Sequence, residues 1–354
     1  MKALRQYGGK DMRLEDIPEP EPGVEEVKIR VKWCGICGTD VHEYEGVTKL
    51  LPVKKPHPGT GKKAPITAGH EFSGEVVKIG KEINDIKVGD RVTVRPTLPC
   101  YKCHYCKQGN HIQCVILGTI GGAADGALAE FVVVPRHTVY QLPDEVTYEM
   151  GAFTEPLASC VHGVKRSHME PGATIAVIGA GPIGLMTMQV ARACGASKII
   201  VFEMIPGRIK LARELGVTAV INPKEVDPGK AIAELTEGRR AEIVFECAGP
   251  SEAMLLAETV CGRGGTIVEI GVMGTSCNFP FPSLWMREKT IVTSQGYTHE
   301  YPAAISFMAT GTVKTAPMLV SAKIRLDDVL EKGFRELTSE RRLEHYKILV
   351  SPEL

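Results

Sequence analysis

The segment after Gly172 constrains the fold most, because apolar strands and helical patterns alternate along it. A buried strand is predicted at 174–178 and a helix at 183–194, and between them the sequence reads Gly179-Ala180-Gly181-Pro182-Ile183-Gly184. A G-x-G-x-x-G loop that joins a buried strand to a helix indicates a dinucleotide site. Further strands are predicted at 198–202, 219–221, 243–245, 266–268 and 290–292, most of them separated by helices. This alternation predicts an α/β domain with a doubly wound parallel sheet.

Each position of the glycine loop has a physical role in the predicted cofactor site. Gly179 permits the tight turn, Gly181 lets the backbone approach a pyrophosphate, and Gly184 lets the helix pack closely on the strand. Pro182 and Ile183 open the helix, whose N-terminal N–H groups attract phosphates. An ordinary turn is the alternative reading of these glycines.

A carboxylate and a guanidinium follow the second predicted strand. Glu203 lies about twenty positions after the loop, where a carboxylate accepts hydrogen bonds from an adenosine ribose and repels the 2′-phosphate of NADP. Glu203 therefore predicts NAD as the cofactor. Arg208 tempers this prediction, since its guanidinium could stack on adenine or offset the repulsion. A solvated strand end is the alternative for Glu203.

The N-terminal part of the chain has a different rhythm. Short runs rich in Val and Ile, such as 27–32, 75–79 and 91–94, alternate with turn residues, which predicts an all-β region. Residues 47–64 have little periodicity and are predicted to form a long surface loop. From the 354 residues we expect three parts: a catalytic domain at 1–155, a cofactor domain at 156–295, and a segment at 296–354 that packs back on the first.

A lobe at about 95–118 contains Cys100, Cys103, Cys106 and Cys114 with the spacing C-x2-C-x2-C-x7-C. Four thiolates this close predict a closed, structural zinc site, and a polar loop without an apolar period needs a metal to order it. A disulfide pair does not suit a reducing compartment. The last gap of seven, followed by Val115, does not suit a ferredoxin-type iron–sulfur cluster.

A second metal site is predicted from scattered residues. Cys37, His70 and Glu71 are all zinc ligand types, and three protein ligands with one open position define a catalytic zinc. Spacing alone indicates this site more weakly than the lobe. A redox pair of Cys34 and Cys37 is a rival interpretation, and a core histidine is the alternative for His70.

The composition restricts the kinds of partner. Lysine plus arginine and aspartate plus glutamate number 42 each, so the net charge is zero, and neither a nucleic acid nor an anionic membrane is favoured. No apolar stretch is long enough to span a bilayer, and the first residues lack the apolar core of a signal peptide. Eleven cysteines, an odd number spread along the chain, fit a reducing compartment. We therefore expect a cytoplasmic protein.

The chain resembles the zinc-containing medium-chain dehydrogenase/reductase family, and within it the polyol branch of sorbitol, L-threonine 3- and 2,3-butanediol dehydrogenases. The matching segments keep the family order and span about half of the chain. They are Cys37-Gly38-Thr39-Asp40-Val41-His42, Gly69-His70-Glu71, the four-cysteine lobe, Gly126-Ala127-Leu128-Ala129-Glu130, Glu155-Pro156-Leu157-Ala158 and the glycine loop. The loop with Lys55-Pro56-His57-Pro58 resembles the butanediol enzymes in particular.

The resemblance implies a GroES-like catalytic domain, a Rossmann cofactor domain and two zinc ions per chain. It implies that Cys37, His70 and a carboxylate, either Glu71 or Glu155, hold the catalytic zinc. Bound to both carboxylates, the zinc would carry a net negative charge and attract an alkoxide less. The resemblance also assigns a proton relay to Thr39 and His42, and it suggests a homotetramer or homodimer.

The expected activity is the reversible, NAD-linked oxidation of a secondary alcohol, either a vicinal diol or a polyol, to a ketone. Alternatives are an L-threonine 3-dehydrogenase and a sugar-alcohol or inositol dehydrogenase. A zinc- and NAD-binding protein without turnover and a thiol-based redox or metal-transfer protein are alternatives of other classes.

Overall fold

The computed structural model describes residues 1–48, 50–273 and 276–354. The chain divides into two compact units. Unit 1 comprises Met1–Glu155, Tyr301–Thr310 and Thr315–Leu354, and unit 2 comprises Pro156–Glu300 and Gly311–Lys314. Residues 296–300 and 311–314, predicted to belong to the C-terminal segment that packs on the first domain, therefore belong to unit 2. Residue 49 of the predicted loop and residues 274–275 of the predicted cofactor domain lie outside the described residues.

Unit 2 is built on a parallel six-stranded sheet with the order β13-β12-β11-β14-β15-β16. Its strands are β11 (Thr174–Ile178), β12 (Lys198–Phe202), β13 (Ala219–Ile221), β14 (Ala241–Glu246), β15 (Cys261–Glu269) and β16 (Thr290–Thr293). Its helices are α4 (Thr154–Arg166, which begins at the end of unit 1), α5 (Pro182–Ala193), α6 (Pro206–Glu214), α7 (Pro228–Leu235), α8 (Ser251–Val260) and α9 (Phe281–Met286). The doubly wound sheet predicted from the sequence is confirmed.

The order of the strands reverses between β11 and β14. From β11 the chain adds β12 and β13 on one side, and it then crosses over to add β14, β15 and β16 on the other side. In open α/β sheets, ligands bind at the carboxyl ends of the strands at this switch point. Both faces of β11 are buried beyond its first residue, as in a central strand covered by helices.

Unit 1 is mainly antiparallel β-structure. A seven-stranded sheet has the order β10-β6-β5-β3-β18-β17, with β9 also paired to β3, and smaller sheets have the orders β2-β1-β4 and β7-β8. The strands are β1 (Lys2–Gly8), β2 (Asp11–Asp16), β3 (Glu26–Gly35), β4 (Ile66–Thr67), β5 (Glu71–Ile79), β6 (Arg91–Val94), β7 (Thr97–Leu98), β8 (Gly118–Thr119), β9 (Phe131–Pro135), β10 (Val139–Gln141), β17 (Val320–Arg325) and β18 (Lys347–Ser351).

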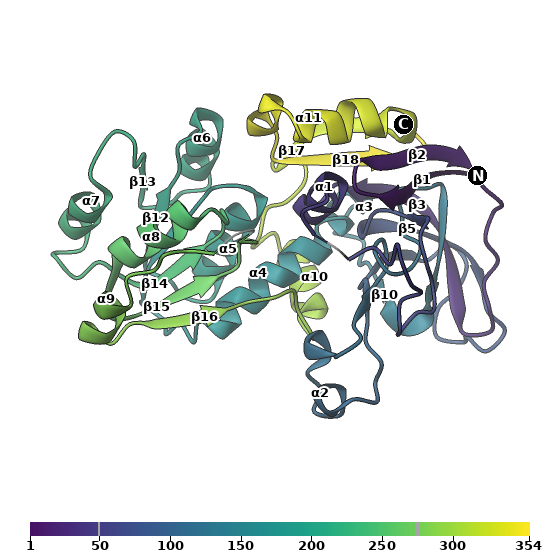
Figure 1. Ribbon diagram of the computed structural model, residues 1–354, viewed down its shortest axis with the longest axis horizontal. Coiled ribbons are helices and arrows are strands. Elements are labelled where there is room, and N and C mark those ends of the chain that lie inside the picture. The colour runs from purple at the N-terminus through teal and green to yellow at the C-terminus, as the bar shows by residue number, and fades with distance from the viewer. Residues whose placement is uncertain (49, 274–275) are drawn as a thin grey trace. The chain divides into compact units, whose positions relative to one another are not determined.

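Short helices complete unit 1. They are α1 (Gly38–Glu45), α2 (His104–Lys107), α3 (Tyr148–Gly151), α10 (Tyr301–Ala309) and α11 (Arg335–Leu337), with 3-10 turns at His111–Gln113, Arg136–Thr138, Leu326–Asp328 and Glu340–Glu344 and a π-helical turn at Val329–Phe334. The lobe that contains α2 projects from the rest of this unit (Figure 1).

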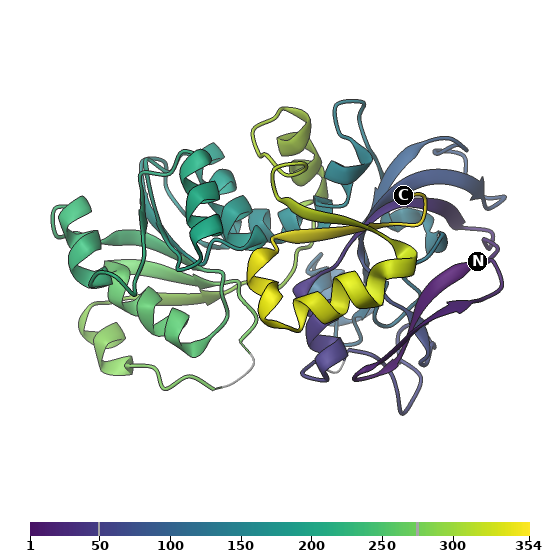
Figure 2. The ribbon, with the colours of Figure 1, turned by 90° about the horizontal axis from the view of Figure 1, so that it is seen from above.

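The C-terminal strands join the sheet formed by the N-terminal residues. β18 pairs antiparallel with the end of β3, with Leu349 opposite Gly35, and β17 pairs parallel with β18. Figures 1 and 2 show the C-terminal segment, in yellow, beside the purple N-terminal strands. One apolar core cluster includes Ile29, Phe72 and Ile348, so distant parts of the sequence form a single core. Across the described residues, no helix combines the length and hydrophobicity required to cross a bilayer.

Candidate active site

Three predicted metal-ligating side chains of unit 1 meet at one place. One ligand atom each from Cys37, His70 and Glu71 lies within 4.8 Å of the other two. Glu71 is the first residue of β5, His70 precedes it, and Cys37 immediately precedes α1. A thiol, an imidazole and a carboxylate at this spacing form a ligand set suited to zinc.

The helix end beside Cys37 fixes this side chain. Cys37 is the N-cap of α1, and its Sγ accepts the backbone N–H of Thr39 at 3.4 Å. The Asp40 carboxylate reaches back and accepts the N–H of Cys37 at 3.0 Å, which completes a capping box. An N-cap sulfur sits at the positive end of the helix, where a thiolate is favoured. Burial nevertheless raises the pKa of the Cys37 thiol, and the Glu71 carboxylate raises it further.

His70 is held by a glycine before it and a carboxylate behind it. Gly69 has a φ of +94°, and a Cβ there would lie 2.8 Å from the Cys34 sulfur, so only glycine fits. Nδ1 of His70 lies 3.2 Å from Oδ1 of Asp40. A carboxylate at one ring nitrogen orients a metal-ligating imidazole and leaves the other nitrogen for the metal. Burial lowers the pKa of His70, but Asp40 and Cys37 outweigh it and hold the pKa well above its usual value.

Glu71 has a buried cation as its partner. Its side chain is 1% exposed, and Oε2 lies 2.5 Å from Nζ of Lys347, the first residue of β18. The same ammonium donates to the carbonyl oxygen of Ile36 at 3.1 Å. Burial lowers the pKa of Lys347, but Glu71, Cys37 and Glu155 outweigh it and raise the pKa above its usual value.

The other candidates of unit 1 lie around this group. Glu155 is half-buried and close enough for its charge to act on Lys347, but it is not part of the three-residue metal group among the described residues. Thr39 and His42 lie on α1, three positions apart and therefore on one face of the helix. His42 is half-buried, and within the described residues its Nδ1 has no hydrogen-bond partner.

The redox interpretation of Cys34 and Cys37 is not supported by the environment of Cys34. Its side chain is 1% exposed, and burial raises the pKa of its thiol well above the usual value. A redox C-x-x-C pair instead requires a partly exposed cysteine with a lowered pKa. Cys34 is a core residue of unit 1.

The four cysteines of the lobe surround a common point. Their sulfur atoms lie within 4.8 Å of one another. Backbone N–H groups point at the sulfurs, including those of Lys102 and Cys103 toward Sγ of Cys100 at 3.4 and 3.3 Å. N–H groups of Cys106 and Val115 lower the pKa of Cys103 to about 6, whereas burial raises the pKa of Cys106 to about 12.

The lobe has almost no apolar core of its own. Within residues 100–114 the buried side chains are those of Cys106 and Cys114. Cys100 and Cys106 have their sulfurs 4.0 Å apart, about twice the length of a disulfide bond. Four converging thiols in a segment without a core fit a structural zinc ion.

The glycine loop of unit 2 leaves room for a ligand at the start of α5. A Cβ on Gly184 would collide with the carbonyl oxygen of Gly179, so this glycine serves helix–strand packing. Among the described residues, a Cβ on Gly181 would meet nothing nearer than Nη1 of Arg208, at 4.0 Å, so the backbone there is open toward them. Gly181 is the N-cap of α5 and provides no side-chain cap, and Pro182 follows it. Uncapped N–H groups at an open helix N-terminus fit a pyrophosphate.

The surroundings of Glu203 do not fit the alternative interpretation as a solvated strand end. It is 6% exposed. Its Oε2 accepts the N–H of Ala180 at 2.8 Å, and its Oε1 accepts those of Met204 and Ile205 at 2.6 and 2.9 Å. Glu203 thus connects the glycine loop to the segment that begins α6. Arg208 lies in the first turn of this helix.

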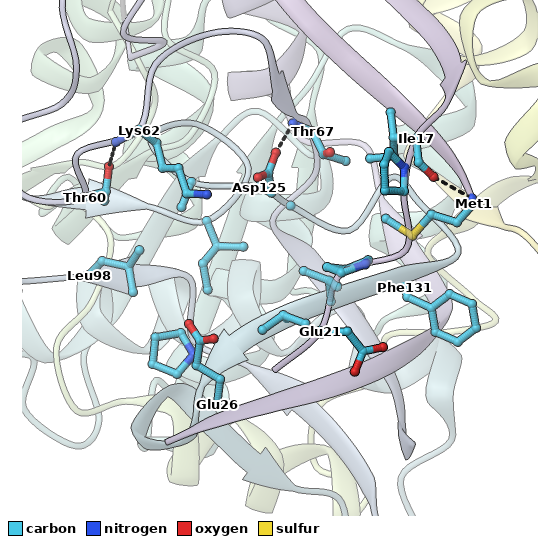
Figure 3. A pocket seen from close by; sticks show the side chains of 18 of the residues that line it. Met1, Ile17, Glu21, Glu26, Thr60, Lys62, Thr67, Leu98, Asp125 and Phe131 are labelled. Atoms are coloured by element: carbon cyan, nitrogen blue, oxygen red, sulfur yellow. Dashed lines mark hydrogen bonds between the residues drawn. The ribbon is translucent and has the colours of Figure 1, made fainter. Parts of the chain in front are cut away.

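A cavity in unit 1 lies away from the metal group. It has a volume of about 520 Å³ and is lined by residues such as Glu21, Lys62, Asp125 and Phe131 (Figure 3). Asp125 is occupied by the N–H of Thr67 at 2.9 Å. None of the predicted catalytic or cofactor residues lines this cavity.

Comparisons with known proteins identify a family for each of the two units. Residues 23–144 match the family model for an alcohol dehydrogenase GroES-like domain, and residues 182–310 match that for a zinc-binding dehydrogenase. The (R,R)-butanediol dehydrogenase of Bacillus subtilis is 40% identical over 99% of this chain and 100% of its own length. The sorbitol dehydrogenase of the same species is 32% identical over 99% and 97%. A crystal structure of 2R,3R-butanediol dehydrogenase from Bacillus subtilis has a TM-score of 0.92, with 38% identity and 99% of each chain covered.

The fold and the two sites define an oxidoreductase with a GroES-like domain and a Rossmann domain. The chain belongs to the zinc-type medium-chain dehydrogenase family, in its polyol branch. The family is zinc-dependent and uses NAD(P), so the family resemblance and fold class predicted from the sequence are confirmed.

Two residues of the site were missed by the sequence analysis as functional groups. Asp40 contacts both Cys37 and His70 and so joins the two segments that carry these ligands. Its position three residues after the N-cap Cys37 is a capping-box pattern, which is the sequence signal that could have identified it. No sequence pattern identifies Lys347. It contacts Glu71 only because β18 pairs with β3, and the two residues are far apart in the sequence.

Proposed function

We propose that this chain catalyses the reversible, NAD-linked oxidation of a secondary alcohol, a vicinal diol or polyol, to a ketone at a zinc ion. The observation that supports this most directly is the convergence of Cys37, His70 and Glu71 in a chain whose relatives are butanediol and sorbitol dehydrogenases. Cys37, His70 and Glu71 are the proposed ligands of the catalytic zinc, with Glu155 nearby as a carboxylate that can exchange with Glu71. The four cysteines of the lobe are the proposed ligands of a second, structural zinc.

When bound, zinc supplies the Lewis acidity that lowers the pKa of a coordinated hydroxyl, and the dinucleotide supplies the hydride acceptor. The chain's own residues prepare these positions. Asp40 keeps the His70 imidazole oriented, and the helix end of α1 holds the Cys37 sulfur. The open Gly181 backbone receives the pyrophosphate, while Glu203 holds the loop beside the adenosine ribose.

The proton released by the alcohol needs a path from the site. Thr39 directly follows the ligand-bearing turn and offers a hydroxyl that can accept one proton while it donates another. His42 lies on the same face of α1 and is half-buried, and an imidazole ring can both accept and donate a proton. We propose that the proton passes from Thr39 to His42.

NAD is the proposed cofactor, because the Glu203 carboxylate lies at the end of β12 and opposes a 2′-phosphate. The position of Arg208, 4.0 Å from where a Gly181 side chain would begin, permits some use of NADP.

The substrate is proposed from the relatives. A butanediol-like vicinal diol is favoured by the 40% identity to the butanediol dehydrogenase. L-threonine and sugar alcohols or inositols are the alternatives, because each presents a secondary hydroxyl to a metal. A zinc- and NAD-binding role without turnover is the remaining alternative.

We also propose a homo-oligomer in the cytoplasm. Helix α9 exposes Phe281, Trp285 and Met286 by 69%, 82% and 63%, and it directly precedes β16, which is an edge strand. A concentrated apolar patch beside an open sheet edge is typical of a protein–protein contact. A homodimer through this surface, or a tetramer made of two such dimers, would cover it.

The test is NADH formation with a panel of vicinal diols, sugar alcohols and amino alcohols. Turnover of diols or polyols is expected for the wild-type protein, and Cys37→Ser should abolish turnover while NAD still binds. Full residual activity of Cys37→Ser would remove this cysteine from the site. Binding of zinc and NAD without turnover of any alcohol would favour the non-catalytic alternative.

A further inference from the structure

Lys347 bridges two segments that hold the proposed zinc ligands. Its side chain is 7% exposed, and its ammonium contacts both the Glu71 carboxylate and the carbonyl of Ile36, the residue before Cys37. The two contacts use two of the three N–H donors of the ammonium. A buried ammonium needs such partners to offset its lost hydration.

Main-chain pairing places this lysine. β18 pairs with the end of β3, and the N–H of Ile36 donates to the carbonyl oxygen of Ile348 at 3.1 Å. The register of the sheet therefore places the backbone of Lys347 beside the turn between β3 and Cys37.

Gly35 packs closely against the Lys347–Glu71 pair. A Cβ on Gly35 would collide with Oε2 of Glu71 and lie 3.3 Å from Cδ of Lys347. A glycine at position 35 is thus required for the Lys347–Glu71 contact, although its φ is not positive.

The two oxygens of Glu71 consequently have different surroundings. Lys347 occupies Oε2 at 2.5 Å. An oxygen that already contacts a cation is a poorer ligand for a second cation, so a metal is favoured at the other oxygen of this carboxylate. A carboxylate free on both oxygens can bind a metal through both, which would fill the position that a catalytic zinc must keep open.

We propose that Lys347 is a positioning residue that keeps Glu71 a one-oxygen ligand and so preserves the open coordination position for the alcohol. The proposal rests on the proposed function, since it assumes that Cys37, His70 and Glu71 bind the metal. The ammonium of Lys347 also offsets negative charge. Four acidic groups would surround the one zinc ion, namely Cys37, Glu71, Glu155 and Asp40.

The experiment replaces the catalytic zinc by Co²⁺ in the full-length protein and records the visible spectrum. Four-coordinate Co²⁺ absorbs strongly and five-coordinate Co²⁺ weakly, so the intensity reports whether Glu71 binds through one oxygen or two. The spectrum of Cys37→Ser, subtracted from each trace, removes the contribution of the four-cysteine lobe.

Lys347→Met should weaken the absorption of the catalytic site while the thiolate band remains, and alcohol turnover should fall by about 10- to 100-fold, as for other residues that orient metal ligands. Lys347→Arg, which keeps the charge and the donors, should restore both. Gly35→Ala should give the same spectrum as Lys347→Met, although it keeps the charges of Lys347 and Glu71, because its Cβ disturbs their contact. This variant replaces Lys347→Met in the test if Lys347→Met does not fold.

Two controls separate positioning from general stability. Lys289→Met removes another buried lysine, paired with Glu258 at 2.7 Å in unit 2, and should leave the cobalt spectrum unchanged. In a Glu71→Ala background, Lys347→Met should add no further spectral change, because the lysine acts through Glu71.

The possible results separate this inference from the proposed function. A wild-type spectrum without a Cys37-dependent thiolate band would refute the proposed metal site itself. A wild-type spectrum with that band, unchanged in both Lys347→Met and Gly35→Ala, would overturn the role of Lys347 and leave the metal site standing.

Discussion

Replacing Glu203 by glutamine tests how the cofactor loop is held and which cofactor it selects. In the structure the carboxylate accepts three backbone N–H groups, from Ala180, Met204 and Ile205. Glutamine keeps the shape but has only one accepting oxygen. If that oxygen faces Met204 and Ile205, the amide NH₂ faces the N–H of Ala180, and two donors oppose each other.

The expected magnitude follows from the lost hydrogen bonds. A hydrogen bond to a charged group contributes about 1.5–3 kcal/mol, so loss of the Ala180 bond should lower the free energy of unfolding by about that amount. Loss of the charge toward the ribose hydroxyls should cost NAD a similar free energy. At 1.4 kcal/mol per factor of ten, the KM for NAD should rise by about 10- to 100-fold. NADP should lose less, because the repulsion of its 2′-phosphate disappears.

The assay is kcat/KM for NAD and for NADP, together with urea unfolding. Glu203→Gln should shift the ratio of the two kcat/KM values toward NADP by at least about tenfold. Glu246→Gln is the matched control, since Glu246 is also a buried carboxylate at a strand end and accepts the N–H groups of Ala248 and Gly249 at 2.7 and 2.9 Å. It should change stability without changing the ratio. An unchanged ratio in Glu203→Gln, beside a clear loss of stability, would mean that Glu203 is purely a structural anchor.

The remaining predictions concern the lobe, the acid stability and the oligomer. Cys106→Ser should release the proposed zinc of the lobe and lower the melting temperature by more than about 2–4 °C, the shift that 1 kcal/mol produces in a domain of ~150–250 residues. Metal analysis and calorimetry measure the two effects. Loss of zinc with an unchanged melting temperature would contradict the role of the metal in ordering the lobe. Burial raises the pKa of Glu300, but His162 and the N–H groups of Thr298 and His299 outweigh it and hold the pKa well below its usual range. This stabilisation is present above the unfolded pKa of about 4.3 and is lost as the pH falls toward the folded value, so Glu300→Gln should flatten the acid side of the stability curve measured by urea unfolding, and a curve parallel to that of the wild type would refute this. Trp285→Glu should lower the mass measured by light scattering, and an unchanged mass would exclude α9 from the contact.

The Rossmann unit was largely predictable from the sequence because its signals are local. The strand at 174–178 and the strand at 198–202 coincide with β11 and β12, since buried parallel strands are continuous apolar runs bounded by turn residues. The spacing of the four cysteines likewise predicted a cluster that the structure brings within 4.8 Å, because a short loop limits how far its thiols can separate.

The arrangement around the proposed catalytic zinc was predictable only in part. Cys37, His70 and Glu71 were identified as candidates, but the role of each carboxylate was left open. The surroundings separate them: Glu71 lies with Cys37 and His70 and is paired with Lys347, whereas Glu155 is not part of the three-residue group.

The amino-acid sequence by itself determined the types of chemistry this protein offers: a glycine-rich loop that opens a helix, a lobe of four closely spaced thiols and a set of zinc ligand types. Those features depend on residue identity and short spacing, which a local pattern records. Only the tertiary structure decided that Lys347 contacts Glu71, that Asp40 joins Cys37 to His70, and that Glu203 is fastened to the glycine loop. These contacts join residues brought together by sheet register and helix capping, and the free energy of such pairs depends on burial, which no short stretch of sequence specifies.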